Sequence, residues 1–427
     1  NPAFYPGLTV FPGYNGPAGS RNNGVPYTEH QQDFSTLELD YNVSESLTLT
    51  SVTGLYNTDQ SAQINASGTS ADGTLFGVNP DFGREDFTQE LRLTSDFVDS
   101  PLNFVLGGFY HDGEMNYFNN LPGNIVTLGV PAVNLGTQDI EIDATSLFGQ
   151  VLWQVTPTWE LTAGGRWTSE EREHTVTTWV CQPFSPIPWP IGCDRGAPVT
   201  PSVQPTVTPK IDSENFSPEF TVAYTPTDDL TYFAAYKQAY KSGSFNSVTV
   251  PDPYIPGIQE QEVSYGDEKI SGWEAGIKAR MLDNQLLVNV AYYDYDYEDM
   301  QVGANDNTGG VSIVTQNAAS SKIRGLEGDF TYSPMAVEGL TLRGAFNWND
   351  SEFEEYGNAV CWGGQSFEEG CNQIFDPTTG LYNAQDLAGQ PLDRSPEYTA
   401  TFGADYEWPI FSGDVIARLS GTVYYSD

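Results

Sequence analysis

Alternation of side-chain types with a period of two recurs along this sequence, and it limits the folds that the chain can adopt. One set of alternate residues runs from aliphatic through aromatic to acidic side chains: Leu286, Val288, Val290, Tyr292, Asp294, Asp296 and Glu298. The set between them is mixed: Leu287, Asn289, Ala291, Tyr293, Tyr295 and Tyr297. A period of two indicates a strand, because successive side chains point to opposite faces. The first face is typical of a strand that passes from hydrocarbon into water, and about ten residues suffice for that passage. A strand of a large soluble sandwich is the alternative.

The alternating segments come in pairs that are joined by short turns. Seven turns are predicted, at 42–46, 96–101, 156–158, 225–229, 282–284, 333–339 and 407–413. Long polar segments separate the pairs, at about 57–84, 113–143, 172–213, 243–269, 300–321 and 350–394. Short turns at one end and long loops at the other are typical of an outer-membrane barrel, whereas a sandwich has mixed loop lengths at both ends. Seven hairpins predict an all-β fold of about 14 antiparallel strands.

The placement of charge supports this interpretation. Most of the bases lie within strands on the polar face: Arg92, Arg166, Lys237, Lys278, Arg280, Arg343 and Arg418. Acids share that face: Glu90, Glu160, Glu219, Glu274, Glu327, Asp329 and Asp405. A charge that faced lipid would cost a few kcal/mol at the membrane midplane. We therefore expect these side chains to face the lumen, where plain structural ion pairs are their simplest role.

Composition excludes some classes of protein. The chain has 57 acids and 17 bases, a formal charge of −40, so binding to nucleic acid is not expected. No apolar run approaches the length of a transmembrane helix. The four cysteines form two local pairs, Cys181 with Cys193 and Cys361 with Cys371, which suggests two loop disulfides in an oxidising compartment. A zinc site is the alternative, but there is no C-x-x-C and the three histidines are scattered.

Several segments, in order, resemble the β-barrel domain of TonB-dependent outer-membrane receptors. They lie at 87–96, 102–114, 146–173, 230–246, 273–302 and 321–334. The fourth ends in KSGSFN, where the family has a Lys-Ser-Gly-Gly-Phe-Asn type of motif and this chain has Ser244 at the second glycine. The resemblance implies a transmembrane barrel of 22 strands that is closed by an N-terminal plug. No plug, TonB-box segment or closing C-terminal strands are present, so residues 1–427 are expected to be one partial barrel domain, about strands 5 to 18, cut from something longer and unstable alone.

The resemblance also implies a function. Such receptors sit in the bacterial outer membrane and take up a scarce ligand with energy from TonB and its inner-membrane partner proteins. A ferric siderophore or other iron complex is the first expectation. The loops are poor in Lys and Arg, which favours neutral, cationic or sugar-like ligands. Uptake of a sugar, cobalamin or a plant-derived compound, a passive porin-type channel and a soluble adhesin are alternatives. An enzyme is not expected, because no G-x-S-x-G, H-E-x-x-H or P-loop motif occurs. No cofactor is expected.

Candidate ligand contacts are the aromatic residues of loops and strand tops and two luminal lysines, although packing within a loop is the simpler role of any one aromatic. They are Tyr117, Phe118, Phe184, Trp189, Lys237, Lys241, Tyr254, Tyr293, Tyr295, Tyr297 and Trp362. Asp294, Asp296 and Glu298 could bind Ca²⁺ and bridge to lipopolysaccharide phosphates, since oxygen ligands suit that ion. Solvated acids at a strand top are the simpler interpretation, so no metal site is assigned beyond this candidate.

Overall fold

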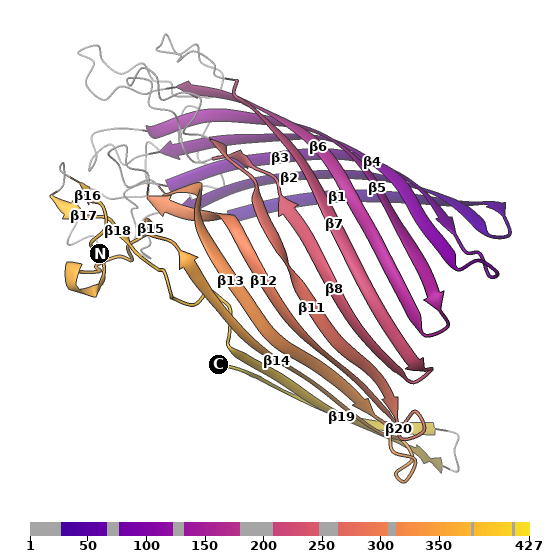
Figure 1. Ribbon diagram of the computed structural model, residues 1–427. Coiled ribbons are helices and arrows are strands. Elements are labelled where there is room, and N and C mark those ends of the chain that lie inside the picture. The colour runs from indigo at the N-terminus through magenta and orange to yellow at the C-terminus, as the bar shows by residue number, and fades with distance from the viewer. Residues whose placement is uncertain are drawn as a thin grey trace, which may run out of the picture.

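A single large antiparallel sheet dominates the computed structural model, which describes residues 27–65, 77–122, 132–179, 208–246, 264–305, 313–376, 380–411 and 415–427. Its first half comprises β1 (Tyr27–Ser44), β2 (Leu47–Asn65), β3 (Gly77–Ser95), β4 (Leu102–Pro122), β5 (Ala132–Thr156), β6 (Trp159–Trp179) and β7 (Lys210–Thr227). It continues through β8 (Leu230–Lys241), β11 (Glu268–Met281), β12 (Leu286–Asn305), β13 (Ile313–Tyr332), β14 (Leu340–Glu355), β19 (Tyr398–Ile410) and β20 (Val415–Ser426). Neighbours in the sheet follow this chain order, and Figure 1 shows them side by side as one curved wall. The prediction of about 14 antiparallel strands is confirmed.

The short turns lie where the sequence predicted them. They occupy the same end of the sheet, opposite the end that carries the small strands β15 to β18 (Figure 1). Some strands continue into the predicted turns, since β1 ends at Ser44, β7 ends at Thr227 and β19 continues to Ile410 rather than ending before Glu407. No helix within the described ranges is long and apolar enough to cross a membrane.

The predicted long loops are wrong over much of their length, because the strands continue into them. β4 has 21 residues and β5 has 25. Since a tilted strand crosses a membrane in about ten residues, strands of this length extend well beyond the hydrocarbon layer. Backbone hydrogen bonds between neighbouring strands continue although both faces have become polar. Segments such as 113–143 therefore hold the ends of strands as well as a connection.

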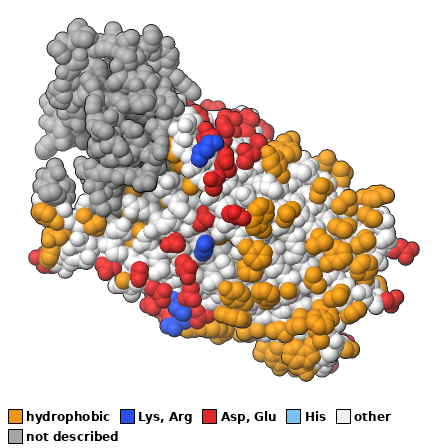
Figure 2. All heavy atoms as spheres, turned by 45° about the horizontal axis from the view of Figure 1, so that its top comes forward, with side chains coloured by type: hydrophobic (Ala, Val, Ile, Leu, Met, Phe, Trp, Pro, Cys, Tyr) orange, Lys and Arg blue, Asp and Glu red, His pale blue; other side chains and the backbone are white. Residues whose placement is uncertain are grey.

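The two faces of the sheet differ in chemistry as the alternation predicted. The outer face exposes large apolar side chains, for example Leu147 at 60%, Phe216 at 59% and Trp273 at 62%. Figure 2 shows a broad area of such side chains, bordered on one side by Asp, Glu, Lys and Arg. An apolar surface of this extent is unusual for a soluble monomer and is typical of contact with lipid. It forms the lipid-facing band of the wall.

Beyond this band, the outer face carries rows of carboxylates that lie directly opposite one another on neighbouring strands. Glu85, Glu114, Glu141 and Glu173 pair in register across β3, β4, β5 and β6, and the row ends at Lys210 of β7. The next row toward the band is Asp112, Asp143, Glu171 and Asp212. The Lys210 Nζ lies 2.6 Å from a Glu173 carboxylate oxygen and 3.2 Å from one of Glu171. Lys210 therefore forms ion pairs with acids of both rows.

These rows predict that cations stabilise the wall. Like charges directly opposite on a sheet destabilise it, by roughly 0.2–1 kcal/mol for each pair. We expect removal of divalent cations to lower the unfolding temperature of the intact protein at low salt, because the carboxylates then repel one another without screening. The double variant Glu114→Gln with Glu141→Gln should be more stable and less sensitive to chelation. Glu338→Gln, in the turn before β14, is the matched control. Equal sensitivity of all three proteins would contradict this interpretation.

A folded segment stands between β14 and β19 at the long-loop end. It contains β15 (Ala359–Val360), β16 (Phe375–Asp376), β17 (Leu381–Tyr382), β18 (Ala384–Gln385) and a short 3₁₀ helix, Phe367–Glu369. Its core joins Phe353, Tyr356 and Ala359 to Ala319 of β13. Cys361 and Cys371 form a disulfide, as predicted. The other predicted disulfide, Cys181 with Cys193, lies outside the described residues.

Candidate functional site

A chain of neighbouring polar side chains crosses the inner face of the sheet from β5 to β12. Gln150 of β5 donates a hydrogen bond to Glu219 of β7, and Glu219 lies directly opposite Lys237 of β8. The Lys237 Nζ lies 2.7 Å from the Glu274 Oε2 on β11, and the Tyr295 hydroxyl of β12 donates to the Glu274 Oε1 at 2.6 Å. Two predicted contacts, Lys237 and Tyr295, therefore meet at Glu274. The Lys237 ammonium and the Tyr295 hydroxyl both donate to the Glu274 carboxylate.

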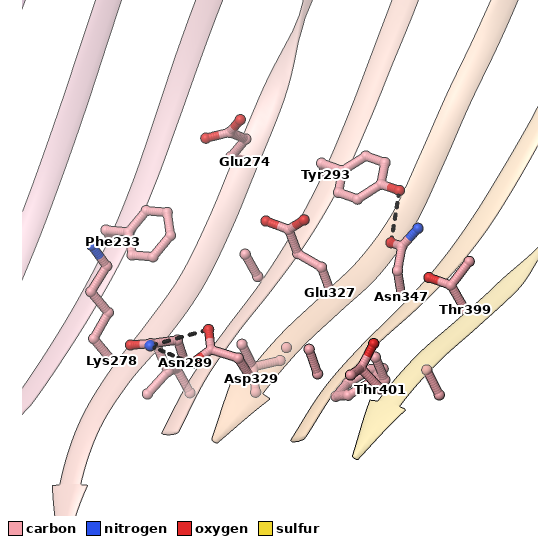
Figure 3. A pocket seen from close by; sticks show the side chains of 17 residues that line it. Phe233, Glu274, Lys278, Asn289, Tyr293, Glu327, Asp329, Asn347, Thr399 and Thr401 are labelled. Carbon is pink, nitrogen blue, oxygen red and sulfur yellow. Dashed lines mark hydrogen bonds between the residues drawn. The ribbon is translucent and has the colours of Figure 1, made fainter. Parts of the chain in front are cut away.

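Next to this chain, the inner wall is hollowed into a pocket of about 530 Å³, which Figure 3 shows from close by. Six strands line it, and the labelled side chains are Phe233, Glu274, Lys278, Asn289, Tyr293, Glu327, Asp329, Asn347, Thr399 and Thr401. The Tyr293 hydroxyl donates to the side-chain oxygen of Asn347 at 3.2 Å or of Asn349 at 3.0 Å. Gly325 gives the Tyr293 ring its space, since a Cβ there would lie 2.4 Å from the hydroxyl oxygen. We call this the wall pocket.

The wall pocket holds more acid than base. Glu274, Glu327 and Asp329 line it together with one ammonium, that of Lys278. Glu274 is paired with Lys237, and Asp329 accepts hydrogen bonds from the Asn289 amide at 3.0 and 3.2 Å. Among the described residues, no ion pair engages Glu327. The Lys278 Nζ lies 5.6 Å from the centroid of the Phe233 ring. The pocket therefore offers carboxylates, amides and hydroxyls to a bound group.

The KSGSFN segment, residues 241–246, links several strands by hydrogen bonds at the long-loop end of the inner wall. The Ser242 hydroxyl donates to Glu170 of β6 at 2.9 Å, and the Gly243 N–H donates to Asp267 at 2.8 Å. Asn246 exchanges two hydrogen bonds with the backbone of Thr315 on β13, at 2.7 and 3.0 Å. The motif thus ties β6, β13 and the residues before β11 together. Lys241, predicted as a contact, is exposed beside this junction.

Close backbone packing explains why the motif has a glycine at Gly243. A Cβ at Gly243 would lie 2.3 Å from the Tyr265 carbonyl oxygen, so the close approach requires glycine. Asp267 also accepts hydrogen bonds from Ser213 and Asn215 of β7. Ser244 is no obstacle, because it belongs to the two-residue strand β9 (Ser244–Phe245), which pairs with β10 (Ser264–Tyr265). The structure therefore accommodates Ser244 in place of the second glycine of the family motif.

A buried histidine lies under this junction. His174 of β6 is fully buried; its Nε2 lies 3.1 Å from the Gln138 Oε1, and its ring lies 4.8 Å from that of Phe245. Within the described ranges, the His174 Nδ1 has no hydrogen-bond partner. Burial lowers the pKa of His174 to about 4, because the imidazolium would lose its hydration.

This histidine predicts a pH dependence of the long-loop end. An unfolded histidine has a pKa near 6.5, so between about 4 and 6.5 the unfolded segment binds more protons than the folded one. Stability therefore falls as the pH drops through that window, by up to ~3 kcal/mol. Because the intrinsic exchange rate itself falls with pH, protection factors are compared, and we expect them to be lower in the outer halves of β5 and β6 at pH 5 than at pH 7. His174→Gln should remove the dependence and His30→Gln, at an exposed position, should keep it. An unchanged profile in His174→Gln would contradict the assignment.

The remaining predicted contacts are spread over the wall. Tyr297 follows Tyr295 on the inner side of β12, and Trp362 is exposed in the disulfide segment. Tyr117 and Phe118 lie in β4 and line a second hollow of about 510 Å³, together with Asp81 and Asp139. Burial raises the pKa of Tyr117. The three other predicted contacts, Phe184, Trp189 and Tyr254, lie outside the described residues.

Two further outcomes concern the sequence predictions. In the calcium candidate, the Lys322 Nζ lies 3.3 Å from both Asp294 and Asp296, so an ammonium group pairs with these two carboxylates. In the part of the chain that the structure describes, no three His, Cys, Asp or Glu side chains are placed to hold a metal ion. Asn347, Thr399 and Thr401 of the wall pocket were not predicted. The sequence signal that could have identified them is their position on the polar face of alternating strands.

Comparison with known proteins gives a consistent result. The family model for the TonB dependent receptor-like beta-barrel matches residues 1–427. Similar solved structures include the ferric yersiniabactin uptake receptor FyuA from Yersinia pestis, with a TM-score of 0.65 and 12% identity over 93% of this chain and 54% of that one. The siderophore receptor PiuA from Acinetobacter baumannii gives 0.61 and 16%, over 93% and 58%. The copper transporter OprC gives 0.56 and 13%, over 89% and 50%. The chain spans about half the length of these structures.

Proposed function

Because this chain belongs to the TonB-dependent receptor β-barrel family, we propose that the protein takes up a scarce ligand, a ferric siderophore or other iron complex, by TonB-dependent transport. The chain lies in the bacterial outer membrane, and members of its family are transporters rather than enzymes. TonB and the inner-membrane proteins that energise it are the partners of this process. The described residues supply the wall along which the ligand passes.

The wall pocket is the observation that carries this proposal. It lies on the inner face, opposite the lipid-facing band, and presents hydroxyl, amide and carboxylate groups that can bind and release a polar ligand. We assign wall contacts to Lys237, Tyr293, Tyr295 and Tyr297, and contacts at the long-loop end to Lys241 and Trp362. Tyr117 and Phe118 would meet a ligand only at the second hollow. An iron complex is favoured because FyuA and PiuA, which share the fold, are receptors for siderophores.

Lipid and lipopolysaccharide are the proposed partners of the outer face. Lipid chains would contact the lipid-facing band. Lys322 and Arg324 lie beyond it on β13, next to the outward Asp294, and their cationic groups suit lipopolysaccharide phosphates. Arg324 is bound to Asp350 at 2.7 Å, so a phosphate would compete with that carboxylate. Release of lipopolysaccharide from the purified intact protein by Lys322→Gln would support this contact, and unchanged binding would contradict it.

A second candidate function is TonB-dependent uptake of a non-iron ligand such as a sugar, cobalamin or a plant-derived compound. The acid-rich wall pocket and its Tyr and Asn groups favour it over a passive porin-type channel. OprC, with the same fold, is a copper transporter. A porin would conduct ions steadily in planar bilayers without TonB.

The proposal is tested by radioiron accumulation in energised cells. The intact protein would be expressed in cells that lack other iron receptors, with and without TonB, and offered ferric complexes of several chemical classes. We expect accumulation of at least one complex that is lost without TonB. Accumulation that is independent of TonB would point to the porin. The lack of iron accumulation, with TonB-dependent entry of a sugar or cobalamin, would establish the second candidate.

A further inference from the structure

The basic side chains of this chain are largely committed to its own acids. In the described residues, Arg84, Arg92, Arg172, Lys210, Lys237, Lys322, Arg324, Arg343 and Arg418 are in ion pairs with Asp or Glu. The Arg166 guanidinium lies over the rings of Phe109 and Phe148, 5.1 and 5.6 Å from their centroids. The segments outside the described ranges contain only two bases in their sequence, Arg21 and Arg195. Five further bases of the described ranges, Lys241, Lys269, Lys278, Arg280 and Arg394, are in no ion pair with a described residue, so unpaired bases are few beside the 57 acids of the sequence.

The surfaces that a ligand would meet are negative or neutral. At the long-loop end, the outer face carries the two rows of acids described above, and the whole chain has a formal charge of −40. In the wall pocket, Glu327 has no basic partner among the described residues, and the Lys278 ammonium lies against the Phe233 ring. A field of this sign slows the approach of anions and attracts cations. A buried anion would also lack the Arg or Lys donors that normally bind it.

We propose that the transported iron complex is neutral or cationic, a hydroxamate type rather than a catecholate or carboxylate type. This inference rests on the proposed function and names its substrate class. Three singly charged hydroxamates neutralise ferric iron, whereas three doubly charged catecholates leave a strongly anionic complex. The wall pocket supplies the matching groups. The Tyr293, Asn289 and Asn347 side chains bind the neutral body of the complex, and the Glu327 carboxylate pairs with any ammonium group that it carries.

The test uses two probes that differ by a single charge and a third that is strongly anionic. They are a ferric trihydroxamate that ends in a primary ammonium, the same complex with that amine acetylated, and a ferric tris-catecholate. Radioiron uptake is measured with the intact receptor in energised cells, and rates are divided by the amount of folded receptor at the surface. The variants are Glu327→Gln, Asp329→Asn as a second change in the pocket, and Glu338→Gln as a matched control in a turn.

We expect both hydroxamates to enter at least about tenfold faster than the catecholate. Glu327→Gln should lower uptake of the ammonium-bearing complex about fivefold relative to its acetylated form, because the ion pair is lost. Glu338→Gln should change neither rate. Preferred uptake of the catecholate would overturn the charge selection. An equal effect of Glu327→Gln on both hydroxamates would overturn the role of Glu327. Uptake of none of the three, with TonB-dependent entry of a non-iron ligand, would overturn the proposed function and this inference with it.

Discussion

An arginine at Leu161 will prevent stable assembly of the wall in the outer membrane, whereas an arginine at the next residue, Thr162, will be tolerated. Leu161 is exposed on the apolar face of β6, and Thr162 lies on the inner face. A guanidinium that faces lipid costs about 2–4 kcal/mol at the midplane and less toward the interfaces. On the inner face it meets water and polar groups. The fraction of intact protein that refolds into lipid vesicles, measured by its shifted mobility on unheated gels, gives the comparison.

This pair of variants is informative because the substitution and the depth in the membrane are the same. Only the face differs, since neighbouring residues of a strand point to opposite sides. Leu161→Ala controls for the loss of the leucine side chain and should assemble. Equal tolerance of arginine at both positions would mean that the apolar face does not contact lipid.

Gly339→Val will disrupt the packing of the turn before β14 against the neighbouring strand β19. Gly339 has a φ of +81°, and a Cβ there would lie 1.8 Å from the Glu407 carbonyl oxygen of β19. The same glycine carbonyl accepts the Glu407 N–H at 2.9 Å, so the backbone has little freedom to move away. We expect a loss of roughly 3 kcal/mol or more in unfolding free energy, from the strained φ and the clash together. Urea unfolding of the intact protein in detergent micelles measures it.

Gly380→Val is the matched control for that experiment. Gly380 also has a positive φ, +72°, but a Cβ there would meet no atom within 4 Å. It should therefore show the cost of the backbone conformation alone. If both variants lose the same stability, the clash with Glu407 contributes nothing and the close approach of Gly339 to β19 is not a constraint.

The alternation in the sequence predicted the faces well. Tyr292 is exposed on the outer face, and Tyr293 and Tyr295 make inner-face contacts, as the period of two requires. The strand ends were predicted less well. In β5 the apolar alternation stops near Ser146, yet the strand begins at Ala132. Hydrophobic periodicity reports contact with lipid, whereas a strand in water persists through backbone hydrogen bonds that leave no such pattern.

The candidate site was predicted in part for a related reason. Lys237 and Tyr295 were recognised as luminal, but their common partner Glu274 was known only as an acid of the polar face. Its role depends on the register of β8, β11 and β12, which fixes the side chains that lie opposite one another. The wall pocket joins β12 to β19 across about a hundred residues of sequence, and spacing along the chain does not reveal such a neighbour.

The claim that the wall pocket lies on the path of the ligand is tested most directly by filling it. Thr401→Trp places a large ring in the pocket, and Thr162→Trp places the same ring elsewhere on the inner face. Initial rates of radioiron uptake would be compared with surface binding in cells that lack TonB. We expect Thr401→Trp to reduce uptake at least about tenfold while surface binding stays intact and Thr162→Trp transports normally. Normal uptake by a folded Thr401→Trp receptor would contradict the account.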